Sequence, residues 1–486
     1  MSERLDVLIV GAGLSGIGAA CHLEERLPGT TYAVLEARDA IGGTWDLFRY
    51  PGIRSDSDMY TLGYRFRPWT GDKAIADGPS ILAYVRETAA AYGVEGKVRY
   101  DARVVAASWS SDDATWTVTL ASGATMTCGF LWCCSGYYDY AGGHSPDFVG
   151  LEDFAGQVVH PQAWPEDLAY DGKRVVVIGS GATAVTLVPA LAKTAAHVTM
   201  LQRSPTYVAS LPGVDKLAVA LREKLPPKAA YAVTRWKNVL YTTATYQLAR
   251  RRPELMKKVL RKGVSALLPD DFDVDRHFKP SYDPWDQRLC LVPDGDLFRS
   301  IRRGNVDVVT EHIDRFTPTG IRLVSGQELE ADVAVTATGL SILAFGGIAF
   351  DVDGSAVHLP DTMAYKGMLL SDVPNFAYVI GYTNASWTLK ADLVSEYVVR
   401  LLARMRERGD DTVVAVRDAE VEEVPFMDFA SGYVQRALHL LPTQGARAPW
   451  RLRQNYLRDI VTIRRGALED GVLRFSRSRA RDRASA

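Results

Sequence analysis

Two segments of the chain share one pattern, in which a short apolar run ends at a glycine-rich turn and continues as an amphipathic stretch. In the first segment, the β-branched run 6–10 predicts a buried parallel strand, and the periodicity after the turn predicts a helix to about Arg26. Residues 32–35 predict the next strand. In the other segment, residues 174–178 predict the strand and residues 182–193 the helix, with a kink at Pro189.

Two further regions have recognisable patterns. Residues 103–134 alternate apolar and polar positions between turn signals, which predicts a small β-meander beside the first segment. Residues 212–285 have few strand signals and many helical ones, and they predict a helical insertion in the second segment. The expected fold class is α/β, with two Rossmann-like dinucleotide-binding domains and a helical insertion in the second.

Both turns have the spacing of the dinucleotide-binding fingerprint, in which glycines allow a tight turn and bring the backbone close to a pyrophosphate. The helix that follows offers unpaired N–H groups to the phosphates. A tight turn without a ligand is the alternative. The residues concerned are Gly11, Gly13, Ser15 and Gly16 in the first turn, and Gly179, Gly181, Ala182, Thr183 and Ala184 in the second, where alanine replaces the third glycine.

The residues that end the second strand differ between the two segments. The first has Glu36, which can accept hydrogen bonds from free ribose hydroxyls. The second has Arg203 and Ser204, a cation and a hydroxyl that suit a 2′-phosphate; a solvated surface arginine is the alternative. We therefore expect NADPH in the second site. Because two dinucleotides in one chain can exchange a hydride, the other cofactor is expected to be a flavin.

The composition narrows the class of protein. A chain of 486 residues with 47% hydrophobic and 23% charged residues is typical of a multidomain globular protein, and a net charge of −2 argues against nucleic-acid binding. The five cysteines are odd in number and lack metal-ligand spacing, so neither a disulfide framework nor a metal site is expected. With no signal-peptide pattern and no apolar run near the ~20 residues of a membrane span, a cytoplasmic protein is expected.

Three other stretches resemble motifs of a known family. Residues 42–58, GGTWDLFRYPGIRSDSD, resemble the second glycine-rich loop of the type I flavin-dependent Baeyer–Villiger monooxygenases, and residues 336–339, TATG, match a late linker motif. Residues 154–165, FAGQVVHPQAWP, match the family fingerprint at Phe154, Gly156, His160 and Trp164. Sister flavin monooxygenases that oxidise amines and sulfides usually have Tyr or Phe in place of Trp164. The likeness covers almost the whole chain and is greatest to the subgroup that activates thioamide prodrugs such as ethionamide.

The resemblance implies a reaction. In the family, NADPH reduces FAD, the reduced flavin takes up O2 as a C4a-peroxyflavin, and attack on a ketone gives an ester or lactone; sulfides and thioamides can be oxidised at sulfur. The protein must stabilise an anion and exclude water. Arg288 matches the active-site arginine, with Asp56 as its expected counter-ion, whereas Gln287 stands where the wider family commonly has lysine. A salt bridge at the edge of the core is the alternative for Arg288.

The resemblance also implies cofactor contacts and one coupling residue. His160 lies between the two segments, and we assign it to coupling domain rotation with cofactor movement rather than to bond chemistry. The further contacts expected are Gly43, Thr44, Trp45, Asp46, Leu47, Asp56 and Val104 for FAD, and Arg54 and Ser55 for NADPH.

The expected domains are an FAD-binding domain of residues 1–146, completed by residues 374–486, and an NADPH-binding domain of residues 147–373. Residues 476–486 predict a disordered tail. The basic stretch 250–262 favours a solvated helix face over peripheral contact with the inner face of a membrane. The expected partner is a small ketone, thioether or thioamide, with no nucleic acid and no transmembrane span.

Three other functions use similar cofactor sites. An enzyme with the same cofactors could have S-oxidation of thioethers or thioamides as its main activity. A pyridine nucleotide–disulfide reductase needs a redox cysteine pair near the flavin, but Thr44 and Trp45 follow Gly43, and this class is rejected. A flavin-binding redox sensor without turnover is disfavoured because Arg288, Asp56 and both glycine turns are present.

Overall fold

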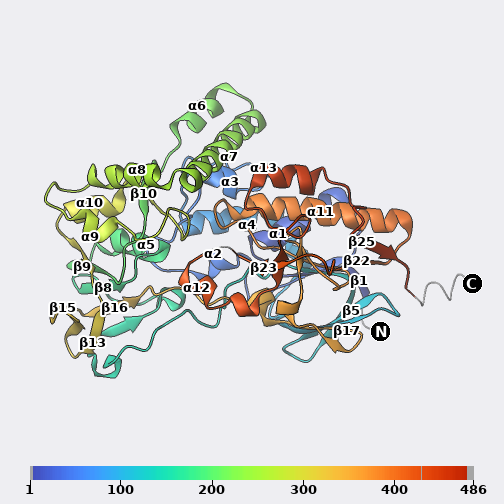
Figure 1. The fold of residues 1–486 in the computed structure, drawn as a ribbon, viewed down its shortest axis with the longest axis horizontal. Coiled ribbons are helices and arrows are strands. Elements are labelled where there is room, and N and C mark those ends of the chain that lie inside the picture. The colour runs from blue at the N-terminus through green and yellow to red at the C-terminus, as the bar shows by residue number, and fades with distance from the viewer. Residues whose placement is uncertain (1–3, 428, 479–486) are drawn as a thin grey trace, which may run out of the picture.

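Two separate sheets organise the molecule, seen in a computed structural model that describes residues 4–427 and 429–478 (Figure 1). The first has nine strands in the order β18-β17-β4-β5-β6-β1-β2-β3, with β21 also paired to β6. The strands predicted at 6–10 and 32–35 and the predicted antiparallel meander all lie in this sheet. Its strands are β1 (Arg4–Val10), β2 (Tyr32–Leu35), β3 (Val98–Arg99), β4 (Val104–Ser110), β5 (Thr115–Leu120), β6 (Thr125–Cys133), β17 (Ala349–Val352), β18 (Ser355–Ala356) and β21 (Phe376–Tyr378).

The second sheet is entirely parallel, in the order β12-β9-β8-β16-β7. Helix α5 (Ala182–Leu191) continues through Pro189 and ends two residues before the predicted Lys193. The first sheet is mixed and the second is parallel, and in each a parallel strand leads through a glycine-rich turn into a helix, so the predicted α/β class is confirmed. The strands are β7 (Gln157–Val159), β8 (Arg174–Ile178), β9 (His197–Gln202), β12 (Val306–Thr310) and β16 (Val333–Thr336).

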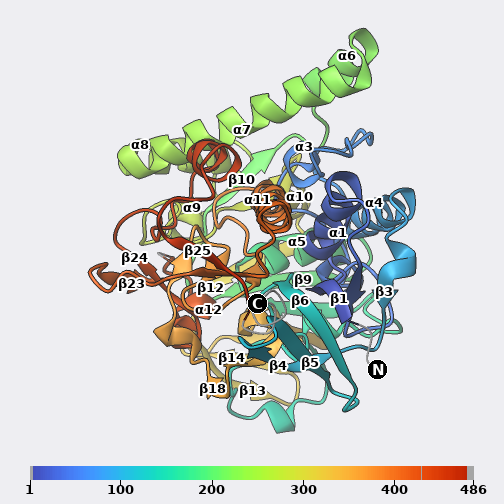
Figure 2. The same ribbon diagram turned by 90° about the vertical axis from the view of Figure 1, so that its right-hand side faces the viewer.

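The predicted helical insertion contains α6 (Lys216–Lys224), α7 (Pro227–Arg251), α8 (Pro253–Ser265) and α9 (Val274–Phe278). The first three, here called the helical arm, form a row along one side of the molecule (Figure 2). Arg235 of α7 is buried and donates hydrogen bonds to the carbonyl oxygens of Tyr60 and Gly63, each at 2.8 Å. We call each sheet with the helices packed on it a fold, the first fold being that of β1 and the second that of β8. Because a buried guanidinium needs such acceptors, these bonds anchor the arm to the first fold.

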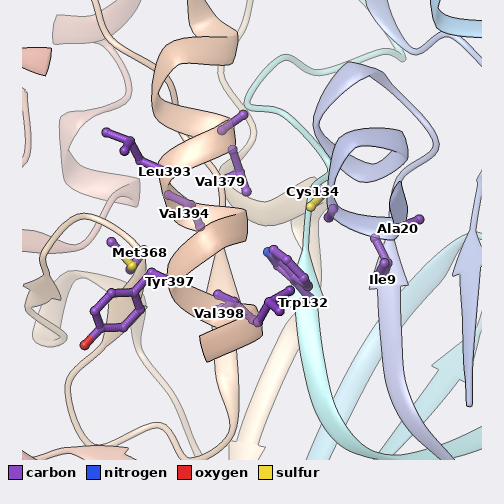
Figure 3. Packing of buried hydrophobic residues seen from close by; sticks show 14 of the residues in the cluster. Ile9, Ala20, Trp132, Cys134, Met368, Val379, Leu393, Val394, Tyr397 and Val398 are labelled. Atoms are coloured by element: carbon purple, nitrogen blue, oxygen red, sulfur yellow. The ribbon is translucent and has the colours of Figure 1, made fainter. Parts of the chain in front are cut away.

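The core of the first fold joins both ends of the chain. Helix α1 (Leu14–Arg26) packs against α11 (Trp387–Arg408). Figure 3 shows Trp132 of β6 between Val394 and Val398 of α11 on one side and Ile9 of β1 on the other. All four of these side chains are fully buried. The N-terminal sheet therefore owes part of its apolar core to residues near the C-terminus.

The chain returns to the first sheet earlier than the expected boundary at residue 374. Strand β17 already pairs in parallel with β4, with Ala349 opposite Ala106. Met363 and Tyr365, also before that boundary, belong to the core cluster of the first fold. The predicted start of the disordered tail, residue 476, is also too early. Ser476 is the last residue of β25, and the Ser478 N–H donates to Asp411 at 2.6 Å. The rest of that tail, residues 479–486, lies outside the described residues.

The remaining helices and strands are shorter or peripheral. They are α2 (Thr44–Leu47), α3 (Met59–Leu62), α4 (Gly78–Ala91), β10 (Val208–Leu211), β11 (Cys290–Pro293), α10 (Asp296–Arg302), β13 (Ile313–Thr317), β14 (Gly320–Leu323), β15 (Glu328–Glu330), β19 (Ala364–Tyr365), β20 (Leu369–Leu370), β22 (Thr412–Ala415), β23 (Glu423–Pro425), α12 (Gly432–Gln435), β24 (Thr443–Gly445), α13 (Tyr456–Asp459) and β25 (Leu473–Ser476).

Candidate active site

One large cavity, about 2430 Å³, is lined by residues from both glycine turns and from the helical arm. Most of the expected site residues line it, although they come from segments up to 277 positions apart. They are Gly11, Gly13, Ser15, Glu36, Gly43, Thr44, Trp45, Leu47, Arg54, Ser55, Asp56, Val104, Gly179, Gly181, Ala182, Thr183, Arg203, Ser204 and Arg288. The expected residues that do not line it are Gly16, Asp46, Ala184 and the four fingerprint residues Phe154, Gly156, His160 and Trp164.

The first turn is shaped by a close approach between helix and strand. A Cβ atom on Gly16 would lie 1.8 Å from the carbonyl oxygen of Gly11, so only glycine fits there. Gly16 thus acts on packing rather than on a ligand. Glu36 is buried and accepts hydrogen bonds from the N–H groups of Ala12 (2.7 Å) and Arg38 (3.0 Å). Burial raises the pKa of the Glu36 carboxyl, and these N–H groups oppose the rise.

Asp46 differs from the expectation of a direct FAD contact. Its side chain is buried and forms ion pairs with Arg38 at 2.8 Å and Arg86 at 2.9 Å. Because a buried carboxylate needs such partners, Asp46 faces the two arginines, and Arg38 of this cluster lines the cavity instead. The role that this geometry supports for Asp46 is positioning of Arg38.

The second turn is equally constrained at its first glycine. Gly179 has a φ of +140°, and a Cβ atom there would lie 2.3 Å from the carbonyl oxygen of Ala337 in the TATG motif. Gly181 is the N-cap of α5, so the N-terminus of this helix opens on the cavity. Arg54 forms an ion pair with Asp296, and the buried Ser55 hydroxyl has no hydrogen-bond partner within the described residues. Ser55 is therefore the freer of the two to bind a ligand.

Arg203 and Ser204 directly follow β9 and are exposed at the cavity. Within the described residues, Arg203 has no hydrogen bond or ion pair.

We predict that Arg203→Ala raises the KM for NADPH by about 10–100-fold, since a charge-assisted hydrogen bond contributes about 1.5–3 kcal/mol, and leaves the KM for NADH unchanged. Steady-state kinetics with both nucleotides measure this difference. Lys193→Ala, on an exposed cation of the same fold, is the control; an equal rise for NADH would contradict the assignment.

Arg288 and Asp56 form the predicted ion pair on the cavity wall. Burial opposes the charge on Arg288, but the Asp56 carboxylate and the neighbouring hydroxyls of Tyr433, Tyr137 and Tyr138 together hold the pKa of Arg288 well above its usual value. Arg288 Nη2 also donates to the Tyr137 hydroxyl at 3.5 Å. The pair therefore keeps a permanently charged donor at the surface of the cavity.

A chain of aromatic contacts joins Arg288 to the first glycine turn. Tyr137 stacks on Trp387, with ring centroids 5.2 Å apart and planes at 17°. Trp387 Nε1 in turn donates to Ser15 Oγ at 2.7 Å. Tyr137 and Trp387 were not among the expected site residues; the three tyrosines between positions 137 and 140, shortly after β6, were the available signal. Trp387 opens α11, whose residues reach the site only through tertiary packing.

Cys128 and Cys133 have the C-x4-C spacing of a redox pair, but they have neither the exposure nor the proximity that a redox-active disulfide needs. Both lie on β6, both are buried, and burial raises the pKa of both thiols. Five positions along an extended strand span roughly 16 Å, which is far beyond disulfide reach. This geometry supports the rejection of a disulfide reductase.

The fingerprint segment lies where the chain passes between the two folds. The outgoing linker, residues 135–146, and the returning linker, residues 337–348, run side by side: the His144 N–H donates to the Gly339 carbonyl at 3.0 Å. His160 lies against the outgoing linker, because a Cβ atom on Gly143 would be 2.0 Å from its ring. The Gln162 amide donates to the Asp139 carbonyl at 2.7 Å. The segment thus contacts the connection between the folds rather than the cavity.

This placement sharpens the assignment of His160. We predict that His160→Ala keeps FAD but lowers NADPH-driven turnover by about 10–100-fold, the cost of misplacing reacting groups by about 1 Å. Gly143→Ala should impair turnover in the wild type, where the new methyl group meets the ring, and add nothing in the His160→Ala background. Absorbance measures bound FAD and oxygen uptake measures turnover. Unchanged kinetics in His160→Ala would refute the assignment.

Comparison with known proteins identifies the family. Two family models match, one described as flavin-binding monooxygenase-like over residues 76–217 and one as an NAD(P)-binding Rossmann-like domain over residues 9–71. The FAD-containing monooxygenase EthA of Mycobacterium tuberculosis is 60% identical over 482 residues, which cover 98% of this chain and 99% of that protein. The chain belongs to the FAD-containing monooxygenases. EthA of Mycolicibacterium smegmatis is 54% identical, with both chains fully covered.

Solved structures of two monooxygenases share the fold. A steroid monooxygenase described as oxidised and bound to NADP superposes with a TM-score of 0.78 at 22% identity, over 98% of this chain and 100% of that chain. A closed cyclohexanone monooxygenase gives 0.72 at 22% identity, over 86% and 88% of the two chains. The predictions of a flavin-dependent monooxygenase and of FAD as cofactor are confirmed by the relatives. Among the described residues, no helix is both long and apolar enough to span a bilayer.

Proposed function

We propose that this FAD-containing monooxygenase is an NADPH- and O2-dependent Baeyer–Villiger enzyme, which inserts one oxygen atom next to a ketone carbonyl to give esters or lactones and also oxidises sulfides or thioamides. The observation that carries the proposal is the Arg288–Asp56 ion pair on a cavity that both glycine turns line. A monooxygenase with this fold is named for a ketone, cyclohexanone.

The residues present fit both cofactors. The first turn and the buried Glu36 suit a dinucleotide with a free 2′-hydroxyl, whereas the second turn with the exposed Arg203 and Ser204 suits NADPH. When bound, the flavin supplies oxygen-activating redox chemistry with electrons from NADPH. Arg288 keeps its charge and presents a planar fork of donors, with which it can stabilise a negatively charged oxygen. Asp56 pairs with one terminal nitrogen of that fork, and the hydroxyl of the stacked Tyr137 accepts a hydrogen bond from the other.

A monooxygenase whose main activity is S-oxidation is the second candidate, because the fingerprint residue that favoured ketone chemistry does not line the cavity. Trp164 packs instead against the core of the second fold and against Tyr170. The Arg288 site would also stabilise negative charge beside a sulfur centre.

The test is oxygen uptake by the FAD-loaded protein with NADPH across linear, cyclic and aryl ketones, thioethers and a thioamide, with product identification. Ester or lactone formation is the expected result. Sulfoxide products with no ester from any ketone would favour the second candidate. Stable FAD without NADPH-dependent oxygen uptake on any of these substrates would overturn both.

A further inference from the structure

Exposed large hydrophobic side chains are concentrated in and beside the helical arm. Among the described residues, ten of the 17 exposed large hydrophobic side chains lie between Val214 and Val259. On α7, Val233, Trp236 and Leu240 follow each other at helical spacing, so they share one face. On α8, Leu255 and Val259 are similarly placed. Monomeric proteins rarely expose so concentrated an apolar surface unless it contacts a partner.

The same arm forms an apolar mouth of the active-site cavity. Five of the ten side chains also line the cavity while 40–56% exposed, and we call them the apolar mouth: Val214, Leu217, Tyr241, Leu248 and Val259. They come from α6, from α7, from α8 and from the residues just before α6. These five apolar side chains are thus in contact with solvent and with the cavity at the same time.

Unpaired cations lie at both ends of α7. Lys224 and Lys228 are exposed near its start, and Arg251 and Lys258 are exposed near its end and on α8. None of these four has an ion pair within the described residues. The arm contains only two acids, Glu223 and Glu254, and Glu254 is paired with Lys257 at 2.8 Å. The apolar face therefore lies between groups of net positive charge.

We propose that the helical arm docks on an anionic lipid bilayer, with the apolar mouth at the lipid surface. Exposed tryptophan and leucine flanked by lysine and arginine are characteristic of helices that lie in the lipid interface, whereas protein interfaces are depleted in lysine. The row of three helices along one side of the molecule gives a long surface that a bilayer can contact (Figure 2). The buried bonds of Arg235 hold that surface in a fixed position relative to the cavity.

The docking surface also indicates the substrate class, and this part rests on the proposed function. Ketones or sulfides with a long alkyl chain partition into lipid, and the apolar mouth gives them a path to Arg288 that avoids water. Small water-soluble substrates can enter the same cavity without a bilayer. The bilayer is thus expected to change the turnover of the first kind of substrate and not of the second.

The first test is sedimentation of the full FAD-loaded chain with vesicles. Vesicles containing phosphatidylglycerol should carry the protein down, and pure phosphatidylcholine vesicles should do so at least about tenfold less. Arg251→Glu/Lys258→Glu and Trp236→Ser/Leu240→Ser should each weaken binding by at least about tenfold. Matched controls are Lys193→Glu/Arg303→Glu and Val149→Ser/Val324→Ser, which change exposed residues elsewhere and should bind like wild type.

Absence of wild-type binding to anionic vesicles, or equal binding by the arm variants, would overturn the proposal. The proposal would also fail if the protein did not bind vesicles but formed a dimer that Trp236→Ser/Leu240→Ser converts to monomer. The apolar surface would then be an interface with a second copy of the chain. The second test compares turnover of a short ketone in buffer with that of a long-chain ketone dissolved in vesicles. Trp236→Ser/Leu240→Ser should reduce only the turnover of the long-chain ketone. If no ketone or sulfide is oxidised, the proposed function fails, whereas the sedimentation result still tests the docking of the arm.

Discussion

Replacing Arg288 by alanine is expected to lower product formation by about 10²–10³-fold, while FAD stays bound. The substitution removes the charged donor from the cavity wall and leaves the Asp56 carboxylate without its ion-pair partner. No residue of the first glycine turn or its Glu36 is altered, so the flavin site should be intact. Product formation by chromatography and FAD absorbance per chain are the two measurements.

Two further variants separate charge from geometry. Arg288→Lys retains the charge without the planar fork, and we expect product formation between those of wild type and Arg288→Ala. Arg103 also lines the cavity, and Arg103→Ala is the matched control, which should form product at the wild-type rate. Wild-type product formation by Arg288→Ala would refute the assigned role of the ion pair.

Gly16→Ala is expected to yield a protein without bound FAD. The added Cβ atom would lie 1.8 Å from the Gly11 carbonyl oxygen, and because both partners are backbone, strand β1 and helix α1 must separate. Overpacking of this kind costs about 1–3 kcal/mol or more, and the separation displaces the turn that the flavin phosphates need. FAD absorbance per chain and the melting temperature report the two consequences.

Gly96→Ala is the matched control, because a Cβ atom there meets nothing within 4 Å. It lies in the same fold and should retain FAD and the wild-type melting temperature. The corresponding position of the second turn already holds Ala184, so the restriction belongs to the first turn alone. Full FAD occupancy in Gly16→Ala would contradict the close packing of α1 on β1.

The sequence was most informative where one short apolar run is bounded by turns. The strand 32–35 was predicted to the residue, and so was 174–178, because each is buried on both faces and a polar or glycine residue follows its end. The Arg288–Asp56 pair could be expected from a resemblance, although 232 positions separate the two residues. Local pattern and family motif thus identified the two turns and the central ion pair.

The parts that could not be predicted depend on distant partners. Strand β17 is four residues long and is stabilised by pairing with β4, so nothing in its own pattern indicates which sheet it joins. Asp46 stands in a cofactor-loop motif, but Arg86 on a neighbouring helix determines where its carboxylate points. Trp387 reaches Ser15 only because α11 packs on α1. In each case the deciding contact is tertiary.

The placement of Trp132 between the two ends of the chain has a consequence for synthesis. The second sheet has all its strands once residue 336 has been made, whereas the first sheet still lacks β17, β18 and β21, and helix α11 has not yet been made. Until α11 emerges from the ribosome, the face of Trp132 that meets Val394 and Val398 has no cover. The fold that begins first along the chain is therefore completed last. During synthesis, the apolar core around the first sheet stays incomplete after the second sheet already has all its strands.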